Sequence, residues 1–422
     1  MAFFCNQMDL TCPFVVIFAS GNEYMAVSAV KYQRKLVYLQ WNKEPEAVKL
    51  DDMELRGISL LNYRNLQEVN TELSPGINCF IGSNGMGKTN LLDAVYYLSF
   101  CKSAVNASDS SNIMHDAPFF MLQGNYCSDA GVVSEVSCGL KRGEKKQFRK
   151  DGKLYERLSD HIGTVPLVMV SPADNELIAG GSEERRRFMD VVISQYDKEY
   201  LQSLIRYNRA LQQRNALLRG EREPDADMLS LIEEMMTEEA IFINRCRKGF
   251  IDELVPIFTA YHNSITGGNE PVSLSYRSHL NDGNLVGLLR TSRADDRRLG
   301  HTSKGVHRDE LVMQLGGYPL RREGSQGQNK TFLVALKLAQ YDFLRTKGGE
   351  MPLLLLDDIF DKLDSRRVEQ IISLVAGDDF GQIFITDVNR EHIDGILEQI
   401  DGAYRLFEVE YGCVSMLKEK IQ

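Results

Sequence analysis

The segment GSNGMGKT at residues 82–89 combines residue types that suit phosphate binding. It fits the pattern G-x-x-x-x-G-K-[ST] in full and lies between a predicted strand and a predicted helix, which is the context this motif requires. Its glycines allow backbone N–H groups to converge on phosphate oxygens, Lys88 places a positive charge near the β and γ phosphates, and Thr89 offers a hydroxyl to Mg²⁺. The pattern predicts ATP and Mg²⁺ as cofactors. A glycine turn that merely starts a helix needs no Lys-Thr pair.

Two adjacent carboxylates follow the apolar run LLLL at residues 353–356. A phosphate loop alone hydrolyses nothing, because Mg²⁺ also needs a carboxylate and the attacking water must be oriented. We expect Asp357 to hold Mg²⁺ together with Thr89. Asp358 is expected to act on the water, with Lys88 as the second catalytic residue. Two acids can simply end a strand at the surface, but the intact phosphate loop favours the ATPase interpretation.

The segment GSQGQ at residues 324–328 precedes a stretch with apolar residues at helical spacing. It resembles the LSGGQ signature of ABC-type ATPases, in which this segment caps the γ-phosphate held by a second subunit. A helix N-terminus suits that use, because it presents unpaired N–H groups and partial positive charge. Taken alone, the segment is more simply an ordinary loop with a polar N-cap. The order of phosphate loop, signature and acidic strand favours a site in trans, made by Ser325, Gln326, Gly327 and Gln328.

The elements that position these motifs follow from apolar periodicity and breaker residues. A strand is expected to start at Met53, followed by a hairpin over residues 66–81 with its turn at 74–76. Residues 117–170 alternate apolar and polar side chains, which predicts more antiparallel sheet ending in a strand at 166–171. Apolar runs at 351–358 and 382–387 predict fully buried strands.

A helical hairpin is expected in the middle of the chain. Residues 182–220 predict one long helix or two in line, opened by a capping box at Ser182 with Arg185 in place of the ideal Glu. The segment EREPD at 221–225 breaks the helix, residues 226–262 resume it, and a loop-rich stretch follows at 267–305. The predicted domains are an N-terminal extension (1–52), an ATPase half (53–175), a helical lobe (176–300) and a second ATPase half (301–422). We interpret the extension as a misplaced translation start or a disordered tail.

Composition restricts the class of protein. With 422 residues and 43% hydrophobic residues, the chain can bury a sizeable core, and it contains no run of eighteen apolar residues. We expect a cytoplasmic location without membrane contact. The eight cysteines form no CxxC pair, which indicates reduced, mostly buried thiols and neither a zinc site nor a disulfide framework.

The net charge of -10 is unlike that of a nucleic-acid binder, but the basic residues are clustered. Eight basic and three acidic side chains lie between Lys141 and Arg157, three arginines are consecutive at 185–187, and a further basic group spans residues 293–308. Any one run can be a solvated face. Three clusters in one acidic chain indicate a charged groove.

From Met53 onward the chain resembles the RecF family of bacterial DNA-repair proteins. The resemblance rests on NYRNL at 62–66, GSNGMGKTNLLDAVYYLS at 82–99, SPADNELIAGGSEERRRFMD at 171–190, HRDEL at 307–311, GSQGQNKTFLVALKLAQ at 324–340 and LLLLDDIFDKLD at 353–364. The string at 171–190 is more specific to the family than the ATPase motifs are. Departures are Val306, where the family usually shows proline, and Asn329.

The resemblance implies an α/β fold, an ABC-type P-loop ATPase head like those of Rad50 and SMC proteins, with an inserted compact helical lobe. RecF-like proteins dimerise head to head around two ATP molecules, bind double-stranded and gapped DNA when ATP-bound, hydrolyse slowly, and work with RecR and RecO. Asp358 is also one methylene shorter than the glutamate usual in related ATPases, so slow hydrolysis is expected here.

The resemblance also assigns roles to individual residues. Arg64 is placed near the base or α-phosphate of the nucleotide, and Asp174 is a candidate link between nucleotide and helical lobe. Asp364 falls in the D-loop, in the DKLD segment at 361–364, and Thr386 or Asp387 replaces the more familiar switch histidine. The nucleotide-binding set is Gly82, Ser83, Asn84, Gly85, Met86, Gly87, Lys88, Thr89, Asn90 and Arg64.

Other classes of function stay open. A transporter ATPase subunit would need a membrane partner and a cassette of ordinary size, whereas roughly 235 residues separate Lys88 from Ser325 here. An ATPase-coupled nuclease would need a further acidic domain after the DKLD segment, for which the chain leaves no room. A DNA-binding module that does not hydrolyse ATP is harder to separate, because slow turnover and none look alike in sequence.

Overall fold

The computed structural model describes residues 14–20, 23–29, 53–128, 130–281, 283–360, 363–377, 379–399 and 401–421. The chain divides into two compact units, Met1–Leu50 and Asp51–Gln422. In the first unit, β1 (Phe14–Ser20) and β2 (Glu23–Ala29) pair antiparallel. The rest of the predicted extension, like Asp361 and Lys362 of the DKLD segment, lies outside the described residues. The following paragraphs concern the second unit.

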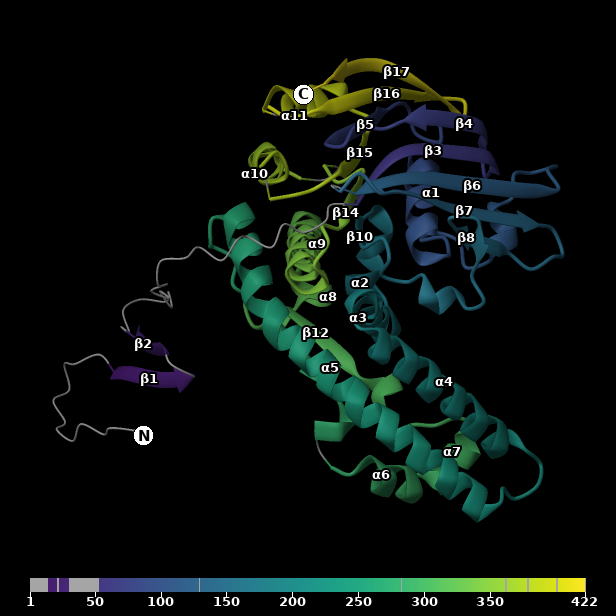
Figure 1. Ribbon diagram of the computed structural model, residues 1–422. Helices are drawn as coiled ribbons and strands as arrows, with labels where there is room; N and C mark the ends of the chain where they lie inside the picture. The colour runs from purple at the N-terminus through teal and green to yellow at the C-terminus, as the bar shows by residue number, and fades with distance from the viewer. Residues whose placement is uncertain are drawn as a thin grey trace. The chain divides into compact units, whose positions relative to one another are not determined.

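An antiparallel sheet of six strands has the order β4-β3-β6-β7-β8-β9. Its strands are β3 (Met53–Tyr63), β4 (Leu66–Glu72), β6 (Phe119–Ser128), β7 (Val133–Lys141), β8 (Gln147–Lys150) and β9 (Lys153–Leu154). The alternating burial along β6 and β7 places one face on the core and the other toward solvent, as expected from their alternating side chains. That buried face packs against α1 (Lys88–Phe100), the helix that follows the phosphate loop (Figure 1).

The predicted hairpin over residues 66–81 is wrong. β4 pairs with β3 through a tight turn in which Arg64 has φ 56°, whereas β5 (Ile77–Ile81) belongs to a different sheet. All five residues of β5 are buried, and a strand covered on both faces suits the middle of a parallel sheet. The SPG segment at 74–76 therefore carries the chain from one sheet to the other.

The second sheet has the order β10-β14-β15-β5-β16-β17, and all of its neighbours are parallel except β16 and β17. Its strands are β10 (Leu167–Val170), β14 (Leu353–Asp357), β15 (Ile383–Asp387), β5, β16 (Tyr404–Glu410) and β17 (Cys413–Lys420). The buried strands expected at 351–358 and 382–387 are confirmed. The strand expected at 166–171 also exists, but it pairs in parallel with β14 and does not continue the antiparallel sheet.

The carboxyl ends of three neighbouring parallel strands bring the predicted chemistry together. β5 runs into the phosphate loop, β14 ends at Asp357, and β15 ends at Asp387. Asp357 is in register with Thr386, and Asp387 with Ile81. The helices that accompany this sheet in sequence are α9 (Gln326–Gly348), α10 (Ser365–Val375) and α11 (Arg390–Gln399). The remaining short helices are α2 (Asn175–Ala179), α8 (Leu320–Glu323), η1 (Asp109–Asn112), η2 (Leu158–Asp160), η3 (Pro172–Asp174), η4 (His279–Asn281) and η5 (Val306–Arg308).

The helical lobe contains two helices where one or two were expected, followed by a long return helix. α3 (Ser182–Tyr196) ends at Asp197, which caps α4 (Lys198–Arg219) by accepting a hydrogen bond from the backbone N–H of Tyr200. The long α5 (Ala226–Thr266) runs back beside α4 (Figure 1). The hairpin is confirmed.

The predicted capping box at Ser182 is wrong. Gly181 is the N-cap of α3, and Ser182 is already the first helical residue. An arginine at the third position has no acceptor to offer the N-cap N–H. The Arg185 side chain instead pairs with Glu310, with Nε–Oε1 at 2.6 Å and Nη2–Oε2 at 3.0 Å.

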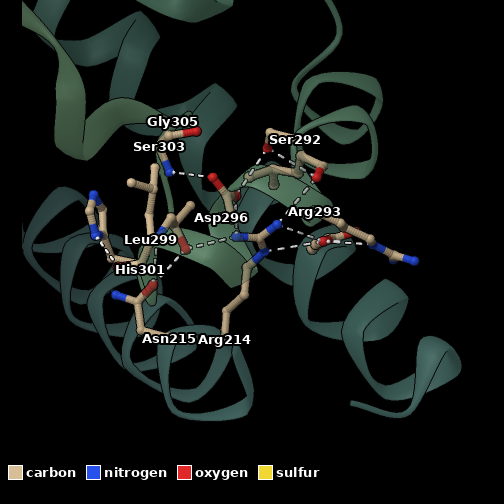
Figure 2. Close-up of polar contacts among 12 residues, drawn as sticks. Arg214, Asn215, Ser292, Arg293, Asp296, Leu299, His301, Ser303 and Gly305 are labelled. Atoms are coloured by element: carbon tan, nitrogen blue, oxygen red, sulfur yellow. Dashed lines mark hydrogen bonds and ion pairs between the residues drawn. The ribbon is translucent and has the colours of Figure 1, made fainter. Parts of the chain in front are cut away.

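The loop-rich stretch expected at 267–305 contains regular elements. β11 (Val272–Arg277) forms a three-stranded sheet with β12 (Glu310–Leu315) and β13 (Tyr318–Pro319), and α6 (Leu285–Thr291) and α7 (Arg293–Leu299) lie against the hairpin. Arg214 of α4, which is fully buried, anchors α6 and α7 to the hairpin. Its guanidinium donates to Asp296 at 2.7 Å and to Glu233 at 3.1 Å, joining α4, α5 and α7 (Figure 2). Buried ion pairs between residues far apart in sequence hold this stretch in place. Local periodicity therefore did not predict its regular elements.

Buried apolar side chains form two clusters, one on each side of the parallel sheet. The first joins β5, β14 and β15 to α9, α10 and the helical lobe, and the second lies between the antiparallel sheet, α1 and the opposite face of the same strands. Among the described cysteines, Cys79, Cys101 and Cys138 are buried free thiols and Cys413 is exposed. Among the described helices, none is long and apolar enough to cross a membrane.

Candidate nucleotide site

The phosphate loop has a backbone that only glycine adopts without strain. Gly82 has φ 154°, and a Cβ atom at this position would lie 2.3 Å from the carbonyl oxygen of Val409 in β16. At Gly87, where φ is 117°, a Cβ atom would lie 2.8 Å from the Leu66 side chain and 3.0 Å from the Asn65 side chain. The loop is thus packed tightly between β16 and the turn after β3, while Ser83, Asn84, Gly85 and Thr89 remain exposed.

The Lys88 side chain folds back over the loop. Its Nζ donates to the carbonyl oxygens of Gly82 at 2.5 Å and Ser83 at 3.0 Å. Burial lowers the pKa of Lys88, and the nearby carboxylates of Asp358, Asp357 and Asp387 act in the opposite direction. These carboxylates keep a positive charge at the place where the motif requires one for phosphate.

Asp357 is buried and held by two hydroxyl groups. Its Oδ1 accepts hydrogen bonds from Thr89 Oγ1 at 3.0 Å and from Thr386 Oγ1 at 2.7 Å. Burial raises the pKa of Asp357, and the two threonine hydroxyls counteract the rise. Because both groups that hydrogen-bond to Oδ1 are neutral hydroxyls, the carboxylate and Thr89 form a hard oxygen donor pair that fits Mg²⁺. Within the described residues no three His, Cys, Asp or Glu side chains gather to ligate a metal by themselves, so phosphates and water would complete its shell.

Asp358 follows in a strained backbone conformation. Its φ is 50°, in the left-handed region that costs a non-glycine residue about 1 kcal/mol or more. The conformation is held by its N–H, which donates to Thr386 Oγ1 at 3.1 Å, and by its carbonyl oxygen, which accepts from Lys330 Nζ of α9 at 3.2 Å. This turn directs the chain away from β14 immediately after Asp357.

Arg64 lies beside the start of α1 within a dense polar network. Its guanidinium donates to Asn90 Oδ1 at 2.6 Å and pairs with the fully buried Asp93 at 3.1 Å. Asn90 in turn donates to Asn65, whose amide donates to the carbonyl oxygen of Gly85. The structure therefore brings Arg64 and Asn90 to the edge of the phosphate loop, with the arginine fixed by protein groups. Their contact with a nucleotide stays a prediction.

The signature segment (residues 325–328) forms the N-terminus of α9. Ser325 is the N-cap, and it forms a full capping box with Gln328: Gln328 N–H donates to Ser325 Oγ, and Ser325 N–H donates to Gln328 Oε1. The polar N-cap expected of this segment in isolation is present. Ser325 and Gln326 are exposed, and Gly327 and Gln328 are partly exposed. The segment is thus not packed into the core of its own chain, and the Ser325 hydroxyl still has its proton to donate.

The remaining predicted residues have mixed positions. Asp364 is the N-cap of α10, accepting from Arg367 N–H at 3.0 Å. Asp174 completes a capping box with Ser171 and pairs with Lys337 of α9 at 2.7 Å, so it links the end of β10 to α9. Thr386 is fully buried between Asp357 and Asp358. Its role as a switch is untested, and its observed contacts are those of a residue that positions both acids.

The comparisons with known proteins agree with this geometry. A family model described as an AAA ATPase domain matches residues 53–216. The DNA replication and repair protein RecF of Phocaeicola vulgatus is 61% identical over 368 residues, covering 87% of this chain and 99% of the relative. RecF of Parabacteroides distasonis is 52% identical over 367 residues, with 87% and 100% covered. The chain belongs to the RecF family.

Solved structures support the same assignment. The recombination mediator protein RecF with ATP, of the RecFOR pathway, is 29% identical and superimposes with a TM-score of 0.77 over 87% of this chain and all of that one. The Smc head domain of Pyrococcus furiosus, with an extended coiled coil, has a TM-score of 0.52 at 14% identity and shows likeness of fold alone. The expected fold class, an ABC-type head of the RecF and SMC kind, is confirmed.

Sequence reasoning missed several residues that shape this RecF-family site. Asn65, Lys330 and His392 were assigned no role, yet each contacts a predicted site residue or its loop. His392 Nδ1 lies 2.9 Å from Asp387 Oδ2, so a histidine does stand near the expected switch position, five residues later and on α11. The phosphate loop, the two acids and the signature segment were visible in the sequence by their local spacing, but the residues that contact them were not.

The three basic clusters differ in how much of their charge is free. Arg185 pairs with Glu310, Arg186 donates to the carbonyl of Asp309, and Arg293 pairs with the buried Glu233. The cluster at 141–157 lies on the end of β7, on β8, on the edge strand β9 and on the turns around them. Its exposed cations are Lys141, which pairs with Glu144 at 2.6 Å, and Arg142, Lys145, Arg149, Lys153 and Arg157. Of the three clusters, this one presents the densest accessible charge.

Proposed function

We propose that this RecF-family chain is an ATP-dependent DNA-binding protein of recombinational repair and replication restart. It binds gapped or junction DNA as an ATP-bound homodimer, releases the DNA on slow hydrolysis, and assists recombinase loading with RecR-type and RecO-type partners. One observation carries the proposal. The same chain has a phosphate loop with an exposed side, at Ser83, Asn84 and Gly85, and an exposed signature segment. Each is a partial site, and a second copy supplies the missing half.

Within each half-site, the residues have separable tasks. The loop amides and Lys88 bind the β and γ phosphates, while Asp358 orients the attacking water. Asp357 and Thr89 hold Mg²⁺, which neutralises phosphate charge when bound. The partner's Ser325 hydroxyl and the first amides of its α9 donate to the γ-phosphate from the other side. Loss of the γ-phosphate removes the contacts that join the two chains, so hydrolysis acts as a release step.

Slow turnover follows from the position of Asp358. Its side chain is one methylene shorter than glutamate, and its φ of 50° already commits the backbone to a strained turn. Because Lys330 and Thr386 fix that turn, the carboxylate cannot advance by backbone movement without breaking those contacts. DNA stimulation of turnover is part of the proposal.

The DNA surface is proposed on the exposed cations of β8, β9 and the turns around them. Contacts of lysine and arginine with phosphates are independent of base sequence and depend strongly on salt. Reversing Lys145 and Lys153 to Glu should weaken binding to gapped duplex DNA and lower the slope of log K against log salt by about 1 per lost contact. Arg298→Glu, at an exposed arginine of the third cluster paired with Asp295, is the matched control. Equal effects of the two changes would place the DNA elsewhere.

Sedimentation of a signature variant tests the dimer. Ser325→Arg fills the exposed N-cap of α9 with a long cation; we expect ATP binding by the single chain to persist and the ATP-dependent dimer to disappear. Asn284→Arg removes the exposed N-cap of another helix, α6, and should dimerise normally. A normal ATP-dependent dimer of the Ser325 variant would refute the site in trans.

A further inference from the structure

Arg367 joins the signature segment to the start of α10. On the α9 side, its Nη1 donates to the carbonyl oxygen of Gly327 at 3.3 Å and to Thr331 Oγ1 at 2.7 Å. On its own helix, Nε lies 3.1 Å from Asp364 Oδ2. The planar guanidinium has its donors in a fixed fork, so these contacts set both the distance and the orientation between the two segments.

Glu270, on the segment before β11, completes the connection. Its Oε1 accepts from Arg367 Nη2 at 2.9 Å and from Gln328 Nε2 at 3.3 Å. Glu270 therefore contacts both the signature segment, through Gln328, and Arg367, which also binds that segment. A third connection runs from α9 to the turn at Asp358, since Lys330 Nζ donates to the carbonyl oxygen of Asp358.

The surroundings of this cluster are unusual for a simple stabilising ion pair. The Arg367 and Glu270 side chains are 18% and 19% exposed, so the pair is largely withdrawn from water. Beneath it, His262 is fully buried, and among the described residues neither of its ring nitrogens has a hydrogen-bond partner. Glu270 Oε2 is also unbonded within that set.

We propose that Arg367 and Glu270 are positioning residues that hold the signature segment and Asp364 as one rigid unit facing the partner chain. With the pair intact, a γ-phosphate on the partner meets the Ser325 hydroxyl, the first amides of α9 and the Asp364 turn at the same time. Without it, the two segments move independently, and forming the shared site requires each to be ordered separately. The inference rests on the proposed ATP-bound homodimer.

The variants are chosen to separate positioning from folding. Arg367→Ala removes all the contacts of the guanidinium. Arg367→Lys keeps the charge but loses the fork, and Glu270→Gln keeps the acceptor oxygen but removes the charge. Arg345→Ala is the matched control. Arg345 lies on α9, the helix that begins with the signature segment, and it pairs with Asp342 and Asp379 away from the site. Thermal melting of each variant without nucleotide reports any general loss of stability.

Two measurements are compared on full-length chains: ATP affinity at protein concentrations too low for dimers, and ATP turnover per chain as protein concentration rises. For Arg367→Ala we expect ATP affinity within about twofold of the unmodified chain, and a protein concentration for half-maximal turnover at least about tenfold higher. For Arg367→Lys and Glu270→Gln, the protein concentration for half-maximal turnover should lie between those of the unmodified chain and Arg367→Ala. For Arg345→Ala it should match that of the unmodified chain.

The outcomes are distinguishable. If turnover by the unmodified chain does not depend on protein concentration, the proposed dimer fails and this inference fails with it. If it does depend on concentration but the Arg367 variants keep the same midpoint, the dimer stands and the positioning role is refuted. A midpoint shift that Arg345→Ala reproduces would reduce the pair to general stabilisation.

Discussion

Replacing Thr386 by valine tests how Asp357, the proposed Mg²⁺ ligand, is held. Valine has nearly the same shape as threonine, so the fully buried position stays filled, while the hydroxyl that donates to Asp357 at 2.7 Å is lost. A hydrogen bond to a charged group contributes about 1.5–3 kcal/mol. The N–H of Asp358 keeps one acceptor, because the backbone oxygen of residue 386 lies 3.3 Å from it. The expected loss of stability is therefore about 2 kcal/mol.

The functional effect should exceed the stability effect. Burial already raises the pKa of Asp357, and the Thr386 hydroxyl is the first of the groups that oppose this rise. Its removal raises the pKa further and leaves the carboxylate poorly oriented. Loss of a group that orients a metal ligand typically lowers metal affinity or activity by about 10–100-fold. We expect the Mg²⁺ concentration for half-maximal ATP turnover to rise by about that factor.

Thr386→Ser is the matched control, because it keeps the hydroxyl and loses a methyl group worth about 0.8 kcal/mol. Urea unfolding gives the stability of both variants, and Mg²⁺ titration of ATP turnover gives the metal requirement. The serine variant should lose stability with an unchanged Mg²⁺ requirement. Equal Mg²⁺ requirements in the valine variant and the unmodified chain would refute the reasoning.

Three further predictions concern stability. Burial lowers the pKa of His161 to about 4, so the folded chain resists a proton that the unfolded chain accepts near pH 6.5, and stability falls as pH falls between these values. Urea unfolding should show about 2 kcal/mol of this loss between pH 8 and pH 5 that His161→Gln lacks; identical pH profiles would contradict it. Arg214→Ala leaves Glu233 and Asp296 buried without their partner and should cost about 3–5 kcal/mol by the same assay, a loss below 1 kcal/mol being the contrary result. Burial disfavours the ionised form of Asp357. Asp357→Asn should therefore raise the melting temperature in Mg²⁺-free buffer at neutral pH, and it should abolish ATP turnover. A lower melting temperature would contradict this account.

The predictable part of the site is the part encoded by local spacing. Residues 82–89 must form a loop between strand and helix because glycine and lysine recur at fixed positions, and the four leucines before Asp357 can only be a buried strand. The order of these motifs along the chain favoured a signature site in trans, and the resemblance to the RecF family supplied the expectation of an ABC-type head. No long-range distance was needed for either conclusion.

The errors have a common physical origin in contacts between distant residues. The segment at 66–81 looked like a hairpin, but pairing of β5 with β15 and β16 outcompeted it. Arg185 looked like part of a capping box, but Glu310, 125 residues away, binds it. The same holds for Thr386 with Asp357 and for Arg367 with Glu270, which no local pattern announces. Residues that position a site were thus less predictable than residues that perform its chemistry.

Cross-linking between two differently modified chains tests the central proposal most directly. A chain carrying Ser83→Cys in the exposed phosphate loop is mixed with a chain carrying Ser325→Cys in the exposed signature segment, and a short thiol cross-linker is added. If two copies enclose the nucleotide, the mixed dimer forms with ATP and a non-cleaving variant background such as Asp358→Asn, and is lost with ADP. Each modified chain mixed with unmodified chain gives the background from native cysteines. Equal cross-linking with ATP and ADP, or none above that background, would contradict the account.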